Sequence, residues 1–186
     1  MTPSSAHAIA LADPPEPTDH SLGSDHAPVT LVEYGDFECP ACKVAVSTPK
    51  LLLERFPNRI RFIFRHFPLQ EPHPHALLAA EAAEAAAGQG KFWSMHDLLF
   101  QNQVHLKERD LYRYAGELGL DLARYSAEMD DHIYLQKVRE HLDSGRRSHL
   151  RATPGFFLDG AVLDISYGMQ KLHDAVAAAV RRASET

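Results

Sequence analysis

The only two cysteines among the 186 residues, Cys39 and Cys42, stand in a single C-x-x-C motif. The run before it, residues 29–34, is β-branched, aromatic and apolar, which predicts a strand. Residues 42–56 carry apolar side chains at helical spacing, and Pro40 suits a first helical turn. The motif therefore lies where a strand leads into a helix. Free backbone N–H groups and the helix dipole stabilise a thiolate there, and the thiolate is the redox nucleophile.

A C-x-x-C motif can also be half of a zinc site, which usually needs four ligands. The chain has no second cysteine pair. His73 and His75 lie far along the sequence, and Pro74 between them keeps them off one helical face. We therefore favour redox chemistry and expect no metal and no cofactor. We also disfavour a pair of inert core cysteines, because residues that begin a helix after a strand are usually accessible.

Length and composition limit the other possibilities. A chain of 186 residues with 45% hydrophobic residues predicts one globular domain, or one domain with a large insertion. A net charge of −6 is not the electrostatic footprint of a nucleic-acid-binding protein. Residues 1–24 are rich in Pro, Ser, Ala and Asp without periodicity, which favours a disordered tail.

The expected location follows from hydrophobic runs. No run approaches the length of a membrane span, and the apolar run at residues 7–12 is too short for a signal-peptide core. We expect a cytoplasmic protein without membrane contact, or a periplasmic or exported one if an export signal has been removed.

The remaining pattern predicts a β-α-β unit, a helical insertion and a β-β-α unit. Asp159-Gly160 between two apolar runs is a hairpin signal. We expect strands at 59–67, 155–158 and 161–166, and helices at 76–87, 91–101, 109–116, 122–129, 132–147 and 169–182. The predicted division is an α/β domain of residues 25–70 and 150–183, with an inserted helical domain at 71–149.

This order resembles the DsbA-like thiol–disulfide oxidoreductases, which have a thioredoxin fold with a helical insertion. The resemblance runs from about residue 19 to residue 183. Its motifs are EYGDFECP at 33–40, FRHFPL at 64–69, HPHA at 73–76, KFW at 91–93 and TPGFF at 153–157.

The resemblance implies a role for several residues. Cys39 would be the attacking thiolate and Cys42 the buried resolving thiol. Thr153 and Pro154 would form the cis-proline pair that faces the sulfurs and contacts an extended substrate chain. The dipeptide between the cysteines, Pro40 and Ala41, would also lie at the substrate. It lacks the histidine found in the strongest oxidants of the family.

Two further positions carry expectations. The family places a buried acid at Glu33, where a carboxylate could take the proton of Cys42; the alternative is a strand glutamate that faces solvent. Gly155 follows Pro154 where the family more often has Thr or Ala, and we interpret it as loosening the substrate-facing loop or making room for a bulkier chain.

The resemblance implies an enzyme that exchanges disulfides with protein thiols or disulfides, together with a recycling partner of unknown identity. We expect a monomer that does not bind nucleic acid. Two alternatives remain open, a thioredoxin-fold peptide-binding module with little turnover and a disulfide isomerase. The direction of net electron flow, the reduction potential and the substrate are not fixed by the sequence.

Overall fold

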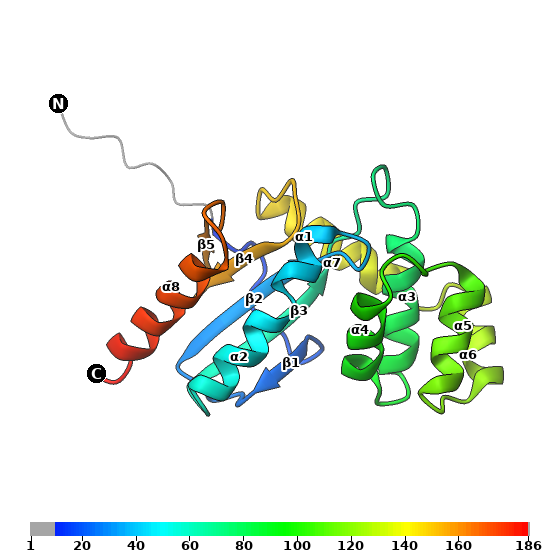
Figure 1. Ribbon diagram of the computed structural model, residues 1–186, viewed down its shortest axis with the longest axis horizontal. Coiled ribbons are helices and arrows are strands. Elements are labelled where there is room, and N and C mark those ends of the chain that lie inside the picture. The colour runs from blue at the N-terminus through cyan, green and yellow to red at the C-terminus, as the bar shows by residue number, and fades with distance from the viewer. Residues whose placement is uncertain (1–9, 186) are drawn as a thin grey trace.

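A computed structural model describes residues 10–185 of the chain. Its centre is a five-stranded sheet with the order β1-β3-β2-β4-β5 (Figure 1). Strands β2 (Val29–Gly35) and β3 (Ile60–His66) run parallel through the middle of the sheet. Strand β1 (His20–Gly23) pairs antiparallel with β3, and β4 (Gly155–Leu158) pairs antiparallel with β2. Strand β5 (Ala161–Leu163) closes the sheet in a hairpin with β4.

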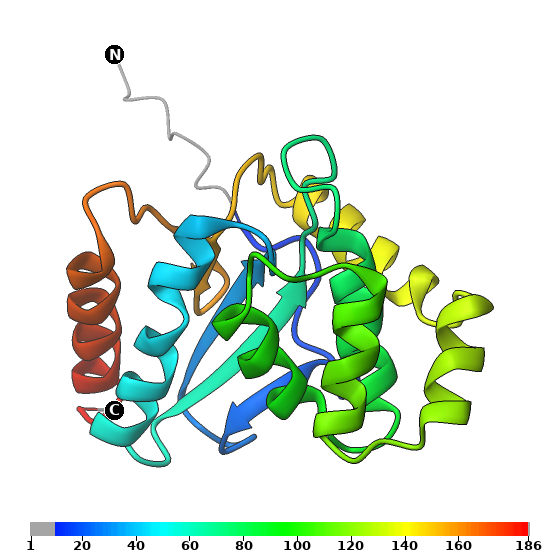
Figure 2. The same ribbon diagram turned by 45° about the vertical axis from the view of Figure 1, so that its right-hand side comes forward.

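Both faces of the two central strands are buried because alternate side chains enter two hydrophobic clusters. Leu31, Phe62 and Phe64 belong to the larger cluster, on the face covered by α2 (Ser47–Arg55) and α8 (Met169–Arg182) (Figure 2). Val32 and Ile63 belong to the smaller cluster on the opposite face, against which residues from α7 (Leu135–Arg147) pack. Near-continuous burial in a parallel pair is typical of α/β sheets.

The C-x-x-C motif opens a helix, but not the single helix expected over residues 42–56. Helix α1 runs from Pro40 to Ala45, and α2 begins at Ser47. Pro49 accounts for this break. Proline has no N–H to donate to the carbonyl four residues earlier, at Ala45, so the series of helical hydrogen bonds is interrupted at Val46.

Five helices follow β3 and precede β4. They are α3 (Ala76–Ala87), α4 (Phe92–Gln101), α5 (Glu108–Glu117), α6 (Leu122–Asp130) and α7. Nine residues of α3 are buried, most of them alanine, so neighbouring helices approach it closely. The expected thioredoxin-like order is confirmed. The division into an α/β domain and an inserted helical domain stays a prediction.

The predicted disordered tail over residues 1–24 is wrong for its described part; residues 1–9 lie outside the described residues. Residues 20–23 form β1 at the sheet edge, and Leu11 donates its N–H to the carbonyl of Gly160 at 2.8 Å. Asp19 accepts two hydrogen bonds from the buried Arg65 guanidinium, at 2.8 and 2.9 Å. The Asp19–Arg65 ion pair ties this N-terminal segment to the sheet. Composition alone cannot reveal a contact between residues so far apart in the sequence.

Among residues 10–185, no helix has both the length and the apolar character needed to span a lipid bilayer.

Candidate active site

The active-site loop joins β2 to α1 and is fixed by two acid–histidine pairs. The buried carboxylate of Asp36 accepts hydrogen bonds from the N–H of Glu38 and the N–H of Leu69, and lies 2.8 Å from Nδ1 of His73. Glu38 lies 2.9 Å from Nδ1 of His75. The HPHA motif therefore anchors the loop that carries the first cysteine. The sequence marks these histidines as part of a family motif and as possible metal ligands, but it does not reveal their role in fixing the loop.

Both cysteines are free thiols, and both are more buried than expected from their place at a helix start. Cys39 is 6% exposed and Cys42 is fully enclosed. Cys39 is the N-cap residue of α1, so its sulfur lies at the end of the helix where N–H groups lack intrahelical acceptors. Pro40 and Ala41 are exposed beside it. Cys39 therefore keeps a small exposed area beside this dipeptide, and Cys42 keeps none.

The pKa of Cys39 is lowered to about 5. The largest cause is a hydrogen bond from the Cys42 thiol, which favours the thiolate. Burial opposes it, and the backbone N–H groups of Cys42 and Ala41 favour the thiolate further. The carbonyl of Thr153, 3.4 Å from the Cys39 sulfur, can only accept a hydrogen bond and so stabilises the thiol form instead. The sulfur is thus a thiolate at neutral pH.

The pKa of Cys42 is shifted the opposite way, far above its ordinary value. Burial is the main cause, because desolvation penalises the charged form. The hydrogen bond that the Cys42 thiol makes with Cys39 raises the pKa further, as do the negative charges of Cys39 and Glu33 at the high pH where both are ionised. One sulfur is therefore ionised while its neighbour keeps its proton.

Glu33 lies inside the protein and not at its surface, with 2% of its area exposed. It sits on β2 opposite Phe64 of β3 and Phe156 of β4. Burial raises its pKa to about 8, and the nearby Cys39 charge contributes. The alternative of a solvent-facing glutamate is wrong. The side chain is a protonated acid at neutral pH in the reduced protein.

The Thr153–Pro154 peptide bond is cis, as the resemblance implies. Gly155, which follows it, does not leave space for a substrate. A Cβ atom there would lie 2.6 Å from Cδ2 of Leu150, so the missing side chain is replaced by that leucine. The expectation of a loosened or enlarged substrate loop at Gly155 is therefore wrong, because the position is buried against the protein's own chain.

One contact at the site comes from a residue that the sequence analysis did not single out. The side-chain amide of Gln103, just after α4, donates to the carbonyl of Cys39 at 2.8 Å. The next residue, Val104, is 86% exposed. The helical insertion therefore reaches the active-site cysteine directly. A lone Gln in a turn has no sequence signal for such a contact.

The sheet, the helix start and the cysteine pair define a thioredoxin-fold protein with a reduced C-x-x-C site. A family model described as thioredoxin matches residues 15–178. The chain belongs to the thioredoxin family.

Solved structures give the same arrangement. The chain is similar to oxidised BdbD from Bacillus subtilis, with 24% identity, a TM-score of 0.79, and coverage of 92% of this chain and 98% of that one. It is similar to a thioredoxin-like oxidoreductase from Silicibacter pomeroyi at 28% identity and a TM-score of 0.75, covering 92% and 95%. It is also similar to alpha-DsbA1 from Wolbachia pipientis at 20% identity and a TM-score of 0.76, covering 91% and 94%.

Curated relatives carry a different name. A Na(+)/H(+) antiporter NhaA 1 from Salinispora arenicola is 45% identical over 172 residues, which is 92% of this chain but 26% of that protein. The NhaA antiporter of Herminiimonas arsenicoxydans is 40% identical over 179 residues, 96% of this chain and 28% of that protein. The chain spans about a quarter of the length of these relatives.

Proposed function

We propose that the chain is a thiol–disulfide oxidoreductase that acts on protein substrates through a mixed disulfide at Cys39, which Cys42 resolves. The observation that carries the proposal is the opposite protonation of the two sulfurs. Cys39 has a pKa of about 5, and Cys42 keeps its proton beside it. A thiolate next to a protonated resolving thiol is what disulfide exchange requires.

The reaction follows from this arrangement. In the oxidising direction, a substrate thiolate attacks the Cys39 sulfur of the Cys39–Cys42 disulfide, and the Cys42 sulfur leaves and takes up a proton. A second substrate thiolate then attacks the substrate sulfur of the mixed disulfide. The substrate disulfide forms, and Cys39 leaves as a thiolate. Two electrons pass from the substrate to the protein, and reduction of a substrate is the reverse sequence.

We propose that Glu33 exchanges the proton of Cys42. Its pKa of about 8 is close to working pH, where a general acid or base is most effective. When Glu33 is ionised, its charge contributes to the raised pKa of Cys42, which supports proton exchange between the two groups. A Glu33→Gln variant should release mixed disulfides at least tenfold more slowly in stopped-flow fluorescence. A Glu33→Asp variant should retain more of the rate.

The low pKa of Cys39 favours net oxidation of substrates. At pH 7 a thiolate with a pKa of about 5 stabilises the reduced protein by about 2.7 kcal/mol, from 1.36 kcal/mol for each pKa unit below the pH. That stabilisation makes the pair about 60 mV more oxidising than a pair with an unperturbed thiol, since 30 mV corresponds to about 1.4 kcal/mol. We therefore propose work in an oxidising compartment, with a separate oxidant to regenerate the disulfide.

Substrate recognition is proposed at Thr153, Pro154, Pro40 and Ala41. The carbonyl of Thr153 lies 3.4 Å from the Cys39 sulfur, and Pro40 and Ala41 are exposed next to Cys39 in the chain. The Silicibacter pomeroyi relative is described as a thioredoxin-like oxidoreductase, which supports redox turnover over a peptide-binding module. Ion transport, which the names of the longer relatives state, has no chemical basis in the cysteine site.

Turnover assays test the proposal. The oxidised protein should introduce disulfides into a reduced, unfolded protein, and the reduced protein with dithiothreitol should reduce insulin. Cys39→Ser should abolish both activities, while Ser47→Ala, an exposed change at the start of α2, should leave both unchanged. Stoichiometric binding of unfolded chains without disulfide transfer would instead establish the binding-module alternative. Reshuffling of scrambled disulfides without net oxidation would establish the isomerase.

A further inference from the structure

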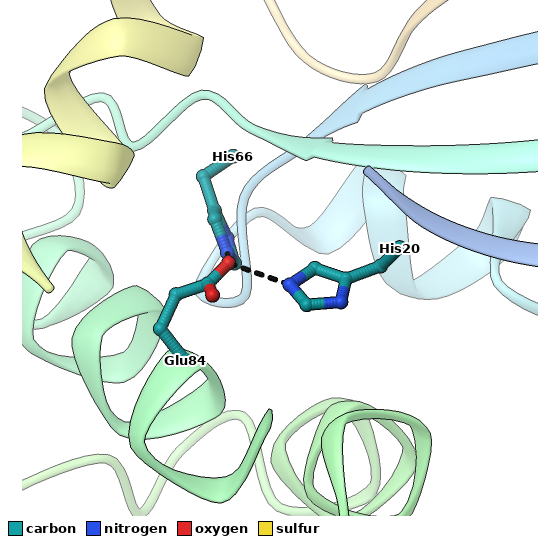
Figure 3. A group of neighbouring side chains, drawn as sticks. All are labelled: His20, His66 and Glu84. Carbon is teal, nitrogen blue, oxygen red and sulfur yellow. Dashed lines mark hydrogen bonds and ion pairs between the residues drawn. The ribbon is translucent and has the colours of Figure 1, made fainter. Parts of the chain in front are cut away.

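A second cluster of reactive side chains lies away from the cysteines, where the sheet edge meets the helical insertion. His20 belongs to β1, His66 ends β3, and Glu84 projects from α3 toward both (Figure 3). Nε2 of His20 is 2.7 Å from Oε1 of Glu84, and Nε2 of His66 is 2.8 Å from the same oxygen. The three ligand-type atoms lie within 4.8 Å of one another.

The cluster also contains a lysine whose contacts cannot all be hydrogen bonds. Nζ of Lys137 lies 2.9 Å from Oε2 of Glu84 and 3.1 Å from Nε2 of His20. An ammonium group only donates, and a carboxylate only accepts. The single Nε2 atom of His20 either carries a hydrogen for Glu84 or presents a lone pair to Lys137, but it cannot do both. A cation bound by lone pairs from all three ligand atoms removes this conflict.

We propose that His20, His66 and Glu84 form a binding site for a divalent transition-metal ion of the Zn²⁺ class, and that the Lys137 ammonium fills the ion's place when no metal is bound. Two imidazoles and one carboxylate are a frequent zinc set, with a fourth position left open. The imidazoles favour such ions over Ca²⁺ or Mg²⁺, which prefer oxygen ligands.

Loading the site needs only small movements. With metal–ligand distances of about 2.0–2.2 Å, tetrahedral ligand atoms are about 3.3–3.6 Å apart, so the present nitrogen–oxygen distances of 2.7 and 2.8 Å must widen by about 0.5–0.9 Å. The Lys137 side chain is 28% exposed and can swing into solvent. Its departure frees the second carboxylate oxygen and opens the fourth position.

The surroundings hold the two rings in place. The His20 ring stacks on Phe92 at a centroid distance of 3.5 Å and an interplanar angle of 10°. The His66 ring stacks on His141 at 5.6 Å and 25°. Fixed ring orientation lowers the entropy lost when an ion binds. An ion here would join β1, β3 and α3, and would therefore stabilise the contact between the sheet and the insertion.

Titration with Co²⁺ followed by visible absorption tests the proposal. The full chain is used with the Cys39–Cys42 disulfide closed, so that the thiolates cannot bind the metal. We expect one equivalent of Co²⁺ with the spectrum of a four-coordinate nitrogen and oxygen site, displaced by Zn²⁺. His20→Phe keeps an aromatic ring against Phe92 and should weaken binding at least tenfold. Lys137→Met should tighten it at least tenfold, and His26→Phe, at an exposed histidine, should leave it unchanged.

A thermal shift gives a second, independent measure. Zn²⁺ should raise the melting temperature of the oxidised wild-type protein and of His26→Phe, and should not raise that of His20→Phe. The proposal is overturned if the wild-type chain gives no four-coordinate Co²⁺ spectrum, including the case in which only Lys137→Met binds the ion. Equal binding by wild type and His20→Phe would overturn it as well.

Discussion

Replacing Cys42 should raise the pKa of Cys39, and the size of the change depends on which atom replaces the sulfur. The hydrogen bond from the Cys42 thiol is the largest contribution to the low pKa of about 5. A hydrogen bond to a charged group contributes about 1.5–3 kcal/mol. At 1.36 kcal/mol per pKa unit, Cys42→Ala should therefore raise the pKa by about one to two units. Cys42→Ser retains an O–H donor and should raise it less.

The assay is thiolate ultraviolet absorbance against pH for the two reduced variants. Cys39→Ser serves as the control, because it should lose the low-pH transition and so assign that transition to Cys39. A Cys42→Ala protein whose pKa stays at about 5 would refute the reasoning. The helix N–H groups, and not the neighbouring thiol, would then account for the shift. Equal pKa values of Cys39 in the Cys42→Ala and Cys42→Ser variants would also refute the reasoning, because only the serine variant keeps a hydrogen-bond donor.

Three further predictions concern stability, measured by urea unfolding of the reduced protein. The pKa of Glu33 is raised from 4.5 to about 8. Its contribution to the free energy of unfolding is therefore fully present below pH 4.5 and is lost as pH rises through 8. Glu33→Gln should thus gain up to about 5 kcal/mol over wild type at alkaline pH, from 1.36 kcal/mol for each pKa unit, and a pH-independent difference would contradict this. Asp19→Ala should cost about 3–5 kcal/mol by leaving Arg65 buried and unpaired, whereas the exposed Asp25→Ala should cost under about 1 kcal/mol. Gly145→Ala should cost about 1–3 kcal/mol, since its Cβ would lie 2.5 Å from the Phe67 ring, while Gly116→Ala has room and should not destabilise; equal effects would argue against the clash.

Local pattern was enough to predict most of the fold. Residues 169–182 were expected as a helix from their periodicity, and α8 has those bounds. The strand–helix junction at the cysteines was also predictable, because β-branched and helical patterns meet there. The break at Val46 was missed because apolar spacing outweighed the signal of Pro49. Strand β1 was missed because it forms only by pairing with β3, and because the segment before it is held by the ion pair with Arg65. Both partners lie far along the chain.

The site was predictable where it depends on neighbours in sequence, and less so where distant residues meet. Cys39 and Cys42 are recognisable by spacing alone. Glu33 needed the sheet to decide which face it occupies. The cluster of His20, His66 and Glu84 was not foreseen, because the expectation of no metal site considered only cysteine pairs and short histidine spacings. Those three residues come from two strands and a helix, which only the tertiary fold brings together.

Capture of a mixed disulfide tests the central claim most directly. Reduced Cys42→Ser and Cys39→Ser proteins are each incubated with an oxidised peptide that contains one disulfide, and the products are identified by mass spectrometry after digestion. We predict a stable adduct on Cys39 in the first variant and little or none on Cys42 in the second, since Cys39 is a thiolate that keeps some exposed area and Cys42 is a fully enclosed thiol. Equal adduct formation on Cys42, or no adduct on Cys39, would contradict the assignment of Cys39 as the nucleophile.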